Sequence, residues 1–252
     1  MWGSNVPANN PARGDADGLN SAFDAPWARK APARTARALL QRLLLVPVVG
    51  VLSPVRVVHR DRLGSLDRPA VFVVNHQSHL DVPVALSALG GKIRRRLVVA
   101  AAADYFYRNK AFGGAVSLAL GCVPFVRRDG SSRPSLELLK RLLREGWSVL
   151  IFPSGSRSDQ TSIKKGFAFL AVDTGSPVVP LHLYGLKDAL PKGSWMPLPG
   201  GVLVGVGNPI DPGTDYDALV ETTRRAIHEL EEEIREVVAG WGEGASTEDE
   251  DS

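Results

Sequence analysis

The segment from Asn75 to Asp81 places a histidine and a carboxylate at a spacing that suits acid–base chemistry. His76 can act as a general base near neutral pH, because an unperturbed imidazole has a pKa of about 6.5. Asp81, five residues later, can accept a hydrogen bond from the second imidazole nitrogen. Such a bond fixes the tautomer and stabilises the imidazolium that forms when the base takes a proton. The pair therefore predicts a general base, His76, that is oriented by Asp81.

Apolar runs on both sides of this segment indicate how it is held. Residues 70–74 precede it and residues 82–86 follow it, a pattern typical of a buried strand that ends in a polar turn and opens into a helix. His79 is an alternative base within the same turn. A helix cap without catalysis is also consistent with the pattern, because aspartate is favoured in a first helical turn.

Two arginines, Arg127 and Arg157, each follow an apolar run that is typical of a strand. If these strands lie parallel in one sheet, both arginines reach its carboxyl edge and can converge on an anion. The planar guanidinium group suits phosphate because it binds two oxygens at once. Exposure to solvent, or pairing with surface carboxylates, is the alternative for both residues.

Four blocks in this order resemble the glycerolipid acyltransferase family, typified by 1-acylglycerol-3-phosphate acyltransferases. The family patterns are N-H-x4-D, G-x-x-[F/P]-x-x-R, F-P-E-G-T-R-S and a V-P-[I/V]-[I/V]-P-like block. The chain carries counterparts at residues 75–81, 121–127, 152–158 and 177–180. The resemblance implies catalytic roles for His76 and Asp81. It implies substrate binding by Arg127, Gly155, Ser156 and Arg157.

The third block departs from the family pattern at two positions. Ser156 replaces threonine and keeps the hydroxyl, but Ser154 stands where the family carries glutamate. The second change removes an anionic acceptor that could orient Arg157 or bond the acceptor lipid. The departure therefore bears on the identity of the acceptor more than on the type of reaction.

The resemblance implies transfer of a fatty acyl chain from acyl-CoA or acyl carrier protein to the free hydroxyl of lysophosphatidate or a related lysolipid. The partners expected are this thioester donor, the lysophospholipid acceptor and a membrane surface. Neither a cofactor beyond the co-substrate nor a metal site is expected, since no Cys/His spacing supports one. Three alternatives stay open: the same chemistry on a different acceptor, such as a lyso-aminolipid or a non-lipid group, thioester hydrolysis, and lipid binding without catalysis.

The composition limits the kinds of fold and binding partner that the chain can have. The 252 residues are 44% hydrophobic, enough for a sizeable core, and the single cysteine excludes an intramolecular disulfide. Cys122 lies in an apolar run and is expected to be a small buried hydrophobe. The formal net charge is +3, and it rises to +8 without the five acidic residues of positions 243–252. A basic body suits anionic headgroups, and no recognition motif points to nucleic acid.

Strand-like runs alternate with helical patterns, which predicts an α/β fold with a largely parallel central sheet flanked by helices. We expect a flexible arm over 1–30, an amphipathic helical segment over 31–52, an acyltransferase domain over 53–240 and a disordered acidic tail over 241–252. The strands are expected at 55–59, 70–74, 97–101, 122–126, 148–152, 178–184 and 202–206. The helices are expected at 82–89, 105–120 with an interruption, 134–145, 163–174 and 215–238.

Residues 31–46 combine arginines with leucines, as in a helix that lies in a membrane interface or packs on the domain. Pro47 is expected to break the apolar run that continues to Leu52. No run reaches the roughly 20 apolar residues that a transmembrane helix requires, and the polar N-terminus is unlike a secretory signal. We therefore expect a cytoplasmic protein that is peripheral on the inner face of the cell membrane.

Overall fold

The computed structural model describes residues 24–76, 78, 80–102, 110–125, 132–153, 163–186 and 202–246. Their centre is a 7-stranded sheet with the order β1-β7-β6-β2-β5-β3-β4. The strands are β1 (Val55–Val58), β2 (Val71–Val74), β3 (Leu97–Ala102), β4 (Cys122–Phe125), β5 (Ser148–Ile151), β6 (Val178–Tyr184) and β7 (Val202–Val206). All neighbours pair in parallel except β6 and β7, which are antiparallel. The predicted α/β fold with a largely parallel sheet is confirmed.

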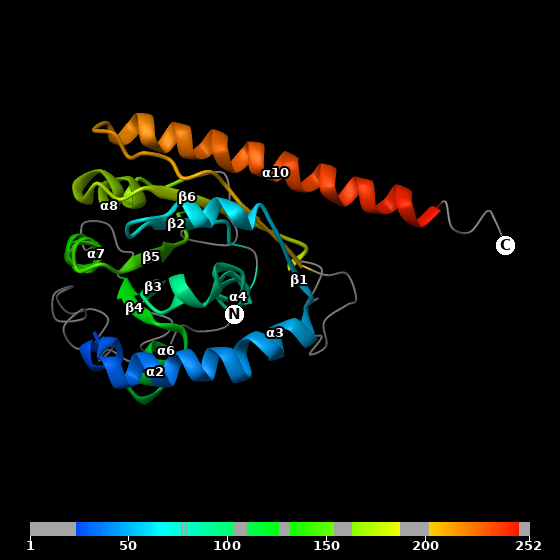
Figure 1. The fold of residues 1–252 in the computed structure, drawn as a ribbon. Helices are drawn as coiled ribbons and strands as arrows, with labels where there is room; N and C mark the ends of the chain where they lie inside the picture. The colour runs from blue at the N-terminus through cyan, green and yellow to red at the C-terminus, as the bar shows by residue number, and fades with distance from the viewer. Residues whose placement is uncertain are drawn as a thin grey trace, which may run out of the picture.

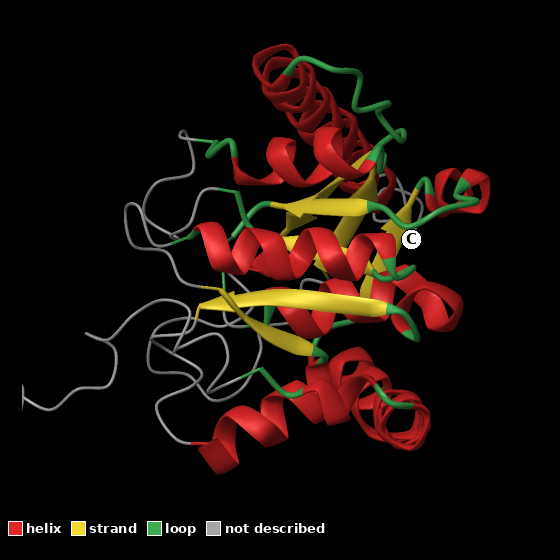
Figure 2. Cartoon of the chain, turned by 90° about the vertical axis from the view of Figure 1, so that its left-hand side faces the viewer, coloured by secondary structure: helices red, strands yellow, loops and turns green. Residues whose placement is uncertain are grey.

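Helices cover both faces of the sheet (Figures 1 and 2). Those on one side are α3 (Val46–Leu52), α4 (Asp81–Arg94) and α6 (Lys110–Leu120), with α2 (Ala31–Leu40) packed on α6. Those on the other side are α7 (Arg133–Arg144), α8 (Gly166–Thr174) and α10 (Tyr216–Ser246). Short helical segments complete the fold: η2 (Pro26–Arg29), η3 (Gln41–Leu45) and η4 (Arg60–Ser65). In Figure 1, α2 and α3 lie along the bottom and α10 along the top.

The central strands are mostly apolar because both sheet faces are buried there, and β2 is apolar throughout. Val71 and Val73 of β2 pack in the core beneath α7 and α8, whereas Phe72 and Val74 pack in the core beneath α4. All four side chains are fully buried. A strand covered on both sides reads as a continuous apolar run, and this makes parallel strands recognisable in a sequence.

Gly205 of β7 lies directly beneath α10. A Cβ atom at this position would lie 2.5 Å from Cδ1 of Ile234 and 3.0 Å from Cδ1 of Leu230. A side chain here would therefore force the ends of Ile234 and Leu230 to move. The glycine lets both side chains pack closely on the strand.

Each predicted strand is present within one or two residues, although Val126 lies outside the described residues. Three expectations about helix ends are wrong. The helix expected to end at Leu89 continues to Arg94, with a kink at Gly90. The last helix does not stop near Gly240 but continues to Ser246, inside the segment expected to be a disordered tail. The helical segment from Ala31 is not broken by Pro47, which lies in the first turn of α3 instead.

The π-helical turn η3 explains how the chain passes Pro47. The amide of Val46 donates to the carbonyl of Gln41, five residues earlier, so the turn just before the proline is wider than an α-turn. A proline ring clashes with the carbonyl four residues before it in a regular helix, and a wider turn relieves that clash. Of the flexible arm expected over 1–30, the structure describes residues 24–30, where Arg29 pairs with Asp24 at 2.6 Å and η2 buries Ala28.

Candidate active site

Asn75 joins the polar turn after β2 to the neighbouring strand β6. Its side-chain nitrogen donates to the carbonyl of Leu183 at 2.9 Å, and its side-chain oxygen accepts from the amide of Leu183 at 2.7 Å. The amide group of this side chain thus replaces the backbone partner that β6 loses where β2 ends. Both bonds lie between residues 108 positions apart in sequence. The turn is therefore fixed to the sheet at its first residue.

His76 and Asp81 lie in direct contact at the carboxyl end of β2. The distance between His76 Nδ1 and Asp81 Oδ2 is 2.5 Å. Asp81 is fully buried as the first residue of α4, where the helix dipole favours a negative charge. Its two carboxylate oxygens also accept from the amide of Ser78, at 2.9 and 3.0 Å. These bonds hold the carboxylate in one orientation beneath the imidazole.

This arrangement assigns the imidazole tautomer. An ionised carboxylate can only accept hydrogen bonds, so Nδ1 of His76 carries the proton that Asp81 accepts. Nε2 then carries the lone pair that can take a proton from a substrate. The Phe152 ring packs against the imidazole with centroids 4.8 Å apart, and the His76 side chain stays 19% exposed. The imidazole is thus contacted by Asp81 and by Phe152 and stays partly exposed to solvent.

The other candidate nucleophiles and bases in the described part of the chain are placed for other roles. Burial raises the pKa of the Cys122 thiol to about 12, so it stays protonated, as expected of a small hydrophobe. His182 is buried in β6, and desolvation lowers its pKa and keeps it neutral. His59 contacts Glu233 at 3.0 Å at the surface. No group of three or more His, Cys, Asp or Glu side chains within the described residues could hold a metal ion.

The remaining predicted residues lie outside the described part of the chain. These are His79, Arg127, Ser154, Gly155, Ser156 and Arg157. The strands that precede the arginines can be placed: β4 ends at Phe125, β5 ends at Ile151, and both run in the direction of β2. Their carboxyl ends therefore share the sheet edge at which His76 lies.

Sequence reasoning missed three contributions to this site. Asn75 was recognised only as part of a motif, and its role as a clamp depends on a strand far along the chain. The Ser78 amide and the Phe152 ring support Asp81 and His76 through contacts that spacing alone does not reveal. An asparagine directly after a buried strand is a usable signal, because its side chain can continue a strand ladder.

The model of the family described as "Acyltransferase" matches residues 54–184, which is more than half of the chain. The chain belongs to this family. The matched range includes β1 to β6 and the entire His76–Asp81 turn.

Several similar proteins carry the name 1-acyl-sn-glycerol-3-phosphate acyltransferase. A chloroplastic 1-acyl-sn-glycerol-3-phosphate acyltransferase from Arabidopsis thaliana is 38% identical over 176 residues, covering 67% of this chain and 47% of that protein. The beta form of the same named enzyme from Homo sapiens is 33% identical over 172 residues, covering 64% of this chain and 59% of that protein. The chain thus spans about half the length of the curated relatives that it matches.

A solved structure extends the likeness to the fold. The 1-acyl-sn-glycerophosphate acyltransferase PlsC from Thermotoga maritima superposes with a TM-score of 0.59 at 25% identity. The superposition covers 78% of this chain and 81% of that one. The arrangement of sheet and helices is therefore shared over most of both molecules.

Proposed function

We propose that this protein transfers a fatty acyl chain from a thioester to the free hydroxyl of lysophosphatidate. The contact between His76 Nδ1 and Asp81 is the observation that carries the proposal, because it orients Nε2 as a base at the sheet edge. The names of the relatives point to the same acceptor. Lipid binding without catalysis would not require a buried carboxylate behind an accessible imidazole.

The proposed reaction needs no nucleophile from the protein. Nε2 of His76 takes the proton of the acceptor hydroxyl while its oxygen forms a bond to the thioester carbonyl carbon. The tetrahedral intermediate then collapses, the carbon–sulfur bond breaks, and the leaving thiolate takes the proton from the imidazolium. Asp81 stabilises the imidazolium between these steps. The products are the acylated lipid and a free thiol.

The acceptor phosphate is assigned to Arg127 and Arg157, with Gly155 and Ser156 in the same role of substrate binding. This part of the proposal is supported by the strand ends that precede the arginines, which share an edge with His76. A pair of guanidinium groups would hold the phosphate and present the free hydroxyl of the glycerol backbone to the base.

A thiol-release assay tests the reaction. Purified protein with palmitoyl-CoA should release free thiol when lysophosphatidate is added, and much more slowly with a lyso-aminolipid or without an acceptor. Thiol release without any acceptor would instead show a hydrolase. Equal rates with palmitoyl-CoA and palmitoyl-acyl carrier protein would show that the donor is recognised by its acyl thioester alone.

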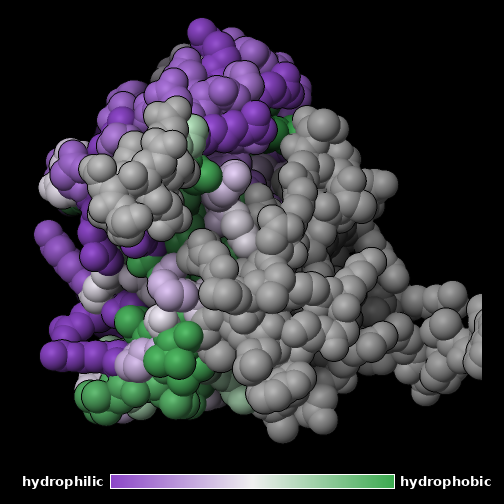
Figure 3. Space-filling model, turned by 90° about the vertical axis from the view of Figure 1, so that its right-hand side faces the viewer, coloured by the Kyte–Doolittle hydropathy of each residue, from purple (hydrophilic) through white to green (hydrophobic). Residues whose placement is uncertain are grey.

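The segment from α2 to α3 is proposed to contact the membrane, with the protein peripheral on the inner face of the cell membrane. No helix in the described part of the chain is long and apolar enough to cross a bilayer. One side of this segment nevertheless exposes apolar side chains. They are Leu39 at 54%, Leu43 at 70%, Leu44 at 56%, Val48 at 43% and Val51 at 84%. Figure 3 shows this apolar surface at the bottom of the molecule, opposite the hydrophilic surface at the top.

Replacing Leu43 and Val51 together by glutamate should lower binding to phospholipid vesicles at least about tenfold. Two charges on the inserted face oppose burial among acyl chains and repel anionic headgroups. Vesicle sedimentation measures the effect. The double variant Ala218→Glu and Ala239→Glu is the matched control, because it places the same charges at exposed positions of α10. Equal loss in both variants would contradict a contact through α2–α3.

A further inference from the structure

Six cationic side chains line one cavity between the segment α2–η3 and the end of α4. They are Arg34, Arg37, Arg42, Lys92, Arg94 and Arg95, and the cavity has a volume of about 440 Å³. No carboxylate belongs to its lining among the described residues. The ion pairs that the described residues form with carboxylates involve other side chains than these six. We call this space the arginine cavity.

Arg37 lines this cavity, and its guanidinium group is buried beside η2 and α6 without enough hydrogen-bond acceptors. Its side chain is among the largest fully buried ones, at 2% exposure. Nη1 reaches the carbonyls of Ala28 and Ser117 only at 3.4 and 3.5 Å, and the buried Nη2 has no partner in the described structure. The buried Nε of Arg34 also lacks one. A buried charged donor without an acceptor costs free energy, so an anion at this place would stabilise the protein.

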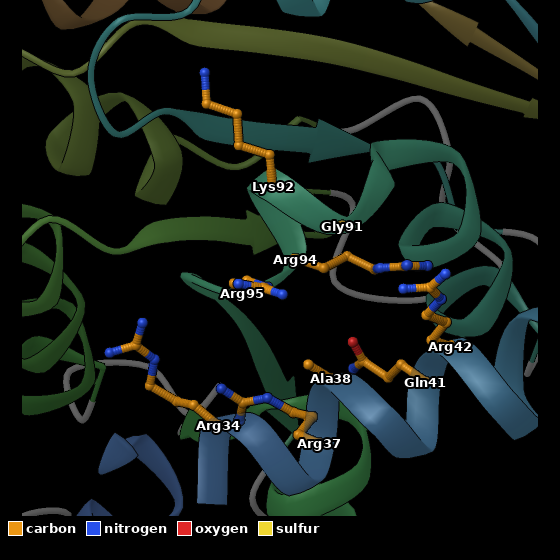
Figure 4. Close-up of a pocket in the computed structure, with 9 residues that line it drawn as sticks. All are labelled: Arg34, Arg37, Ala38, Gln41, Arg42, Gly91, Lys92, Arg94 and Arg95. Carbon is orange, nitrogen blue, oxygen red and sulfur yellow. The ribbon is translucent and has the colours of Figure 1, made fainter. Parts of the chain in front are cut away.

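The positive charges around the cavity also favour a bound anion. Burial and the neighbouring Arg34 lower the pKa of Arg37, and burial and Arg60 lower the pKa of Arg94. Figure 4 shows the guanidinium groups of Arg94 and Arg42 approaching each other from α4 and η3, whereas Lys92 points away from them. Like charges from two helices repel unless an anion lies between them.

The arginine cavity is separate from the proposed active site. The guanidinium carbon of Arg34 lies 5.5 Å from the ring of Trp147, the residue directly before β5. Arg95 lies two residues before β3. Both therefore mark the amino ends of parallel strands, whereas His76 follows the carboxyl end of β2. The length of a strand, roughly 15–20 Å, separates the two places.

We propose that the arginine cavity binds the phosphate group of an anionic membrane lipid. Arg42 belongs to the same helical segment as the exposed Leu39 and Leu43, so the cavity opens beside the apolar surface that would meet the bilayer. A phosphate there would accept hydrogen bonds from guanidinium groups of both helices and join α2 to α4. The site would thus anchor a headgroup independently of the acyl acceptor.

Calorimetric titration of the full chain with short-chain phosphatidylglycerol tests this site. The probe is soluble, carries one phosphodiester, and is neither substrate nor product of the proposed reaction. We expect saturable binding that weakens at least about tenfold in the double variant Arg42→Gln and Arg95→Gln, because two charge-assisted hydrogen bonds to the phosphate are lost. Both side chains are exposed at the cavity rim, so the fold should persist, and thermal melting checks this.

The double variant Arg141→Gln and Arg225→Gln is the matched control, since it removes the same charge from exposed positions of α7 and α10. It should bind the probe like the unmutated protein. Equal weakening in both variants would show diffuse attraction and overturn the site. Binding of inorganic phosphate or coenzyme A that depends on Arg42 and Arg95, without such dependence for phosphatidylglycerol, would overturn the assignment to a lipid.

Discussion

Replacement of His76 by alanine is expected to lower kcat for acyl transfer about 10²–10⁴-fold, the usual contribution of a positioned general base. The change removes Nε2 as the proton acceptor and leaves the hydroxyl of the acceptor without activation. The KM for lysophosphatidate should change little, because the residues assigned to the phosphate are elsewhere. Steady-state thiol release at saturating acceptor measures kcat directly.

His228→Ala is the matched control for this substitution. His228 is exposed on α10, so its loss removes an imidazole without touching the turn after β2. The control should keep the activity of the unmutated chain, and both variants should melt within a few degrees of it. Undiminished turnover in His76→Ala would mean that another group, with His79 the first candidate, is the base.

Asp81→Asn is expected to produce the second large loss, also about 10²–10⁴ in kcat. The asparagine oxygen can still accept from the Ser78 amide, but its nitrogen donates and cannot accept the Nδ1 proton of His76. The imidazole must then rotate away from the asparagine or take the tautomer that carries the proton on Nε2. In that tautomer Nε2 cannot act as a base. The stability should fall by about 1.5–3 kcal/mol, because a buried charge-assisted bond is lost.

Kinetics together with thermal melting separate these two effects. Asp61→Asn serves as control. Asp61 lies exposed in η4, and its replacement removes the same charge. We expect the control to match the unmutated protein in kcat and in melting temperature. A variant Asp81→Asn that melts normally and keeps full kcat would show that the carboxylate only caps α4.

The strands and the contact between His76 and Asp81 could be predicted from the sequence because their signals are local. A strand buried on both faces, such as residues 70–74, is a continuous apolar run, and a polar turn after it marks the sheet edge. His76 and Asp81 are five residues apart, so one turn brings them together. Motifs of this kind can be predicted from the sequence because they do not depend on distant parts of the chain.

The features that sequence reasoning missed depend on distant contacts or on local exceptions. The clamp of Asn75 requires Leu183, and the arginine cavity combines residues 34–42 of one helical segment with residues 92–95 at the end of another. The run Arg94-Arg95-Arg96 is visible in the sequence, but the helical segment that faces it across the cavity is about 50 residues away and cannot be inferred from the run. Pro47 was read as a helix breaker, because a π-turn that accommodates it has no sequence signal of its own.

The Asn75 clamp also affects when the turn after β2 reaches its final position. During synthesis, Leu183 follows Asn75 by 108 residues, so this turn is made long before the strand that fixes its first residue. Until β6 joins the sheet, the contact between His76 and Asp81 can form locally, but the turn lacks both of its bonds to Leu183. The position of His76 relative to the sheet is therefore set late, when most of the chain has folded.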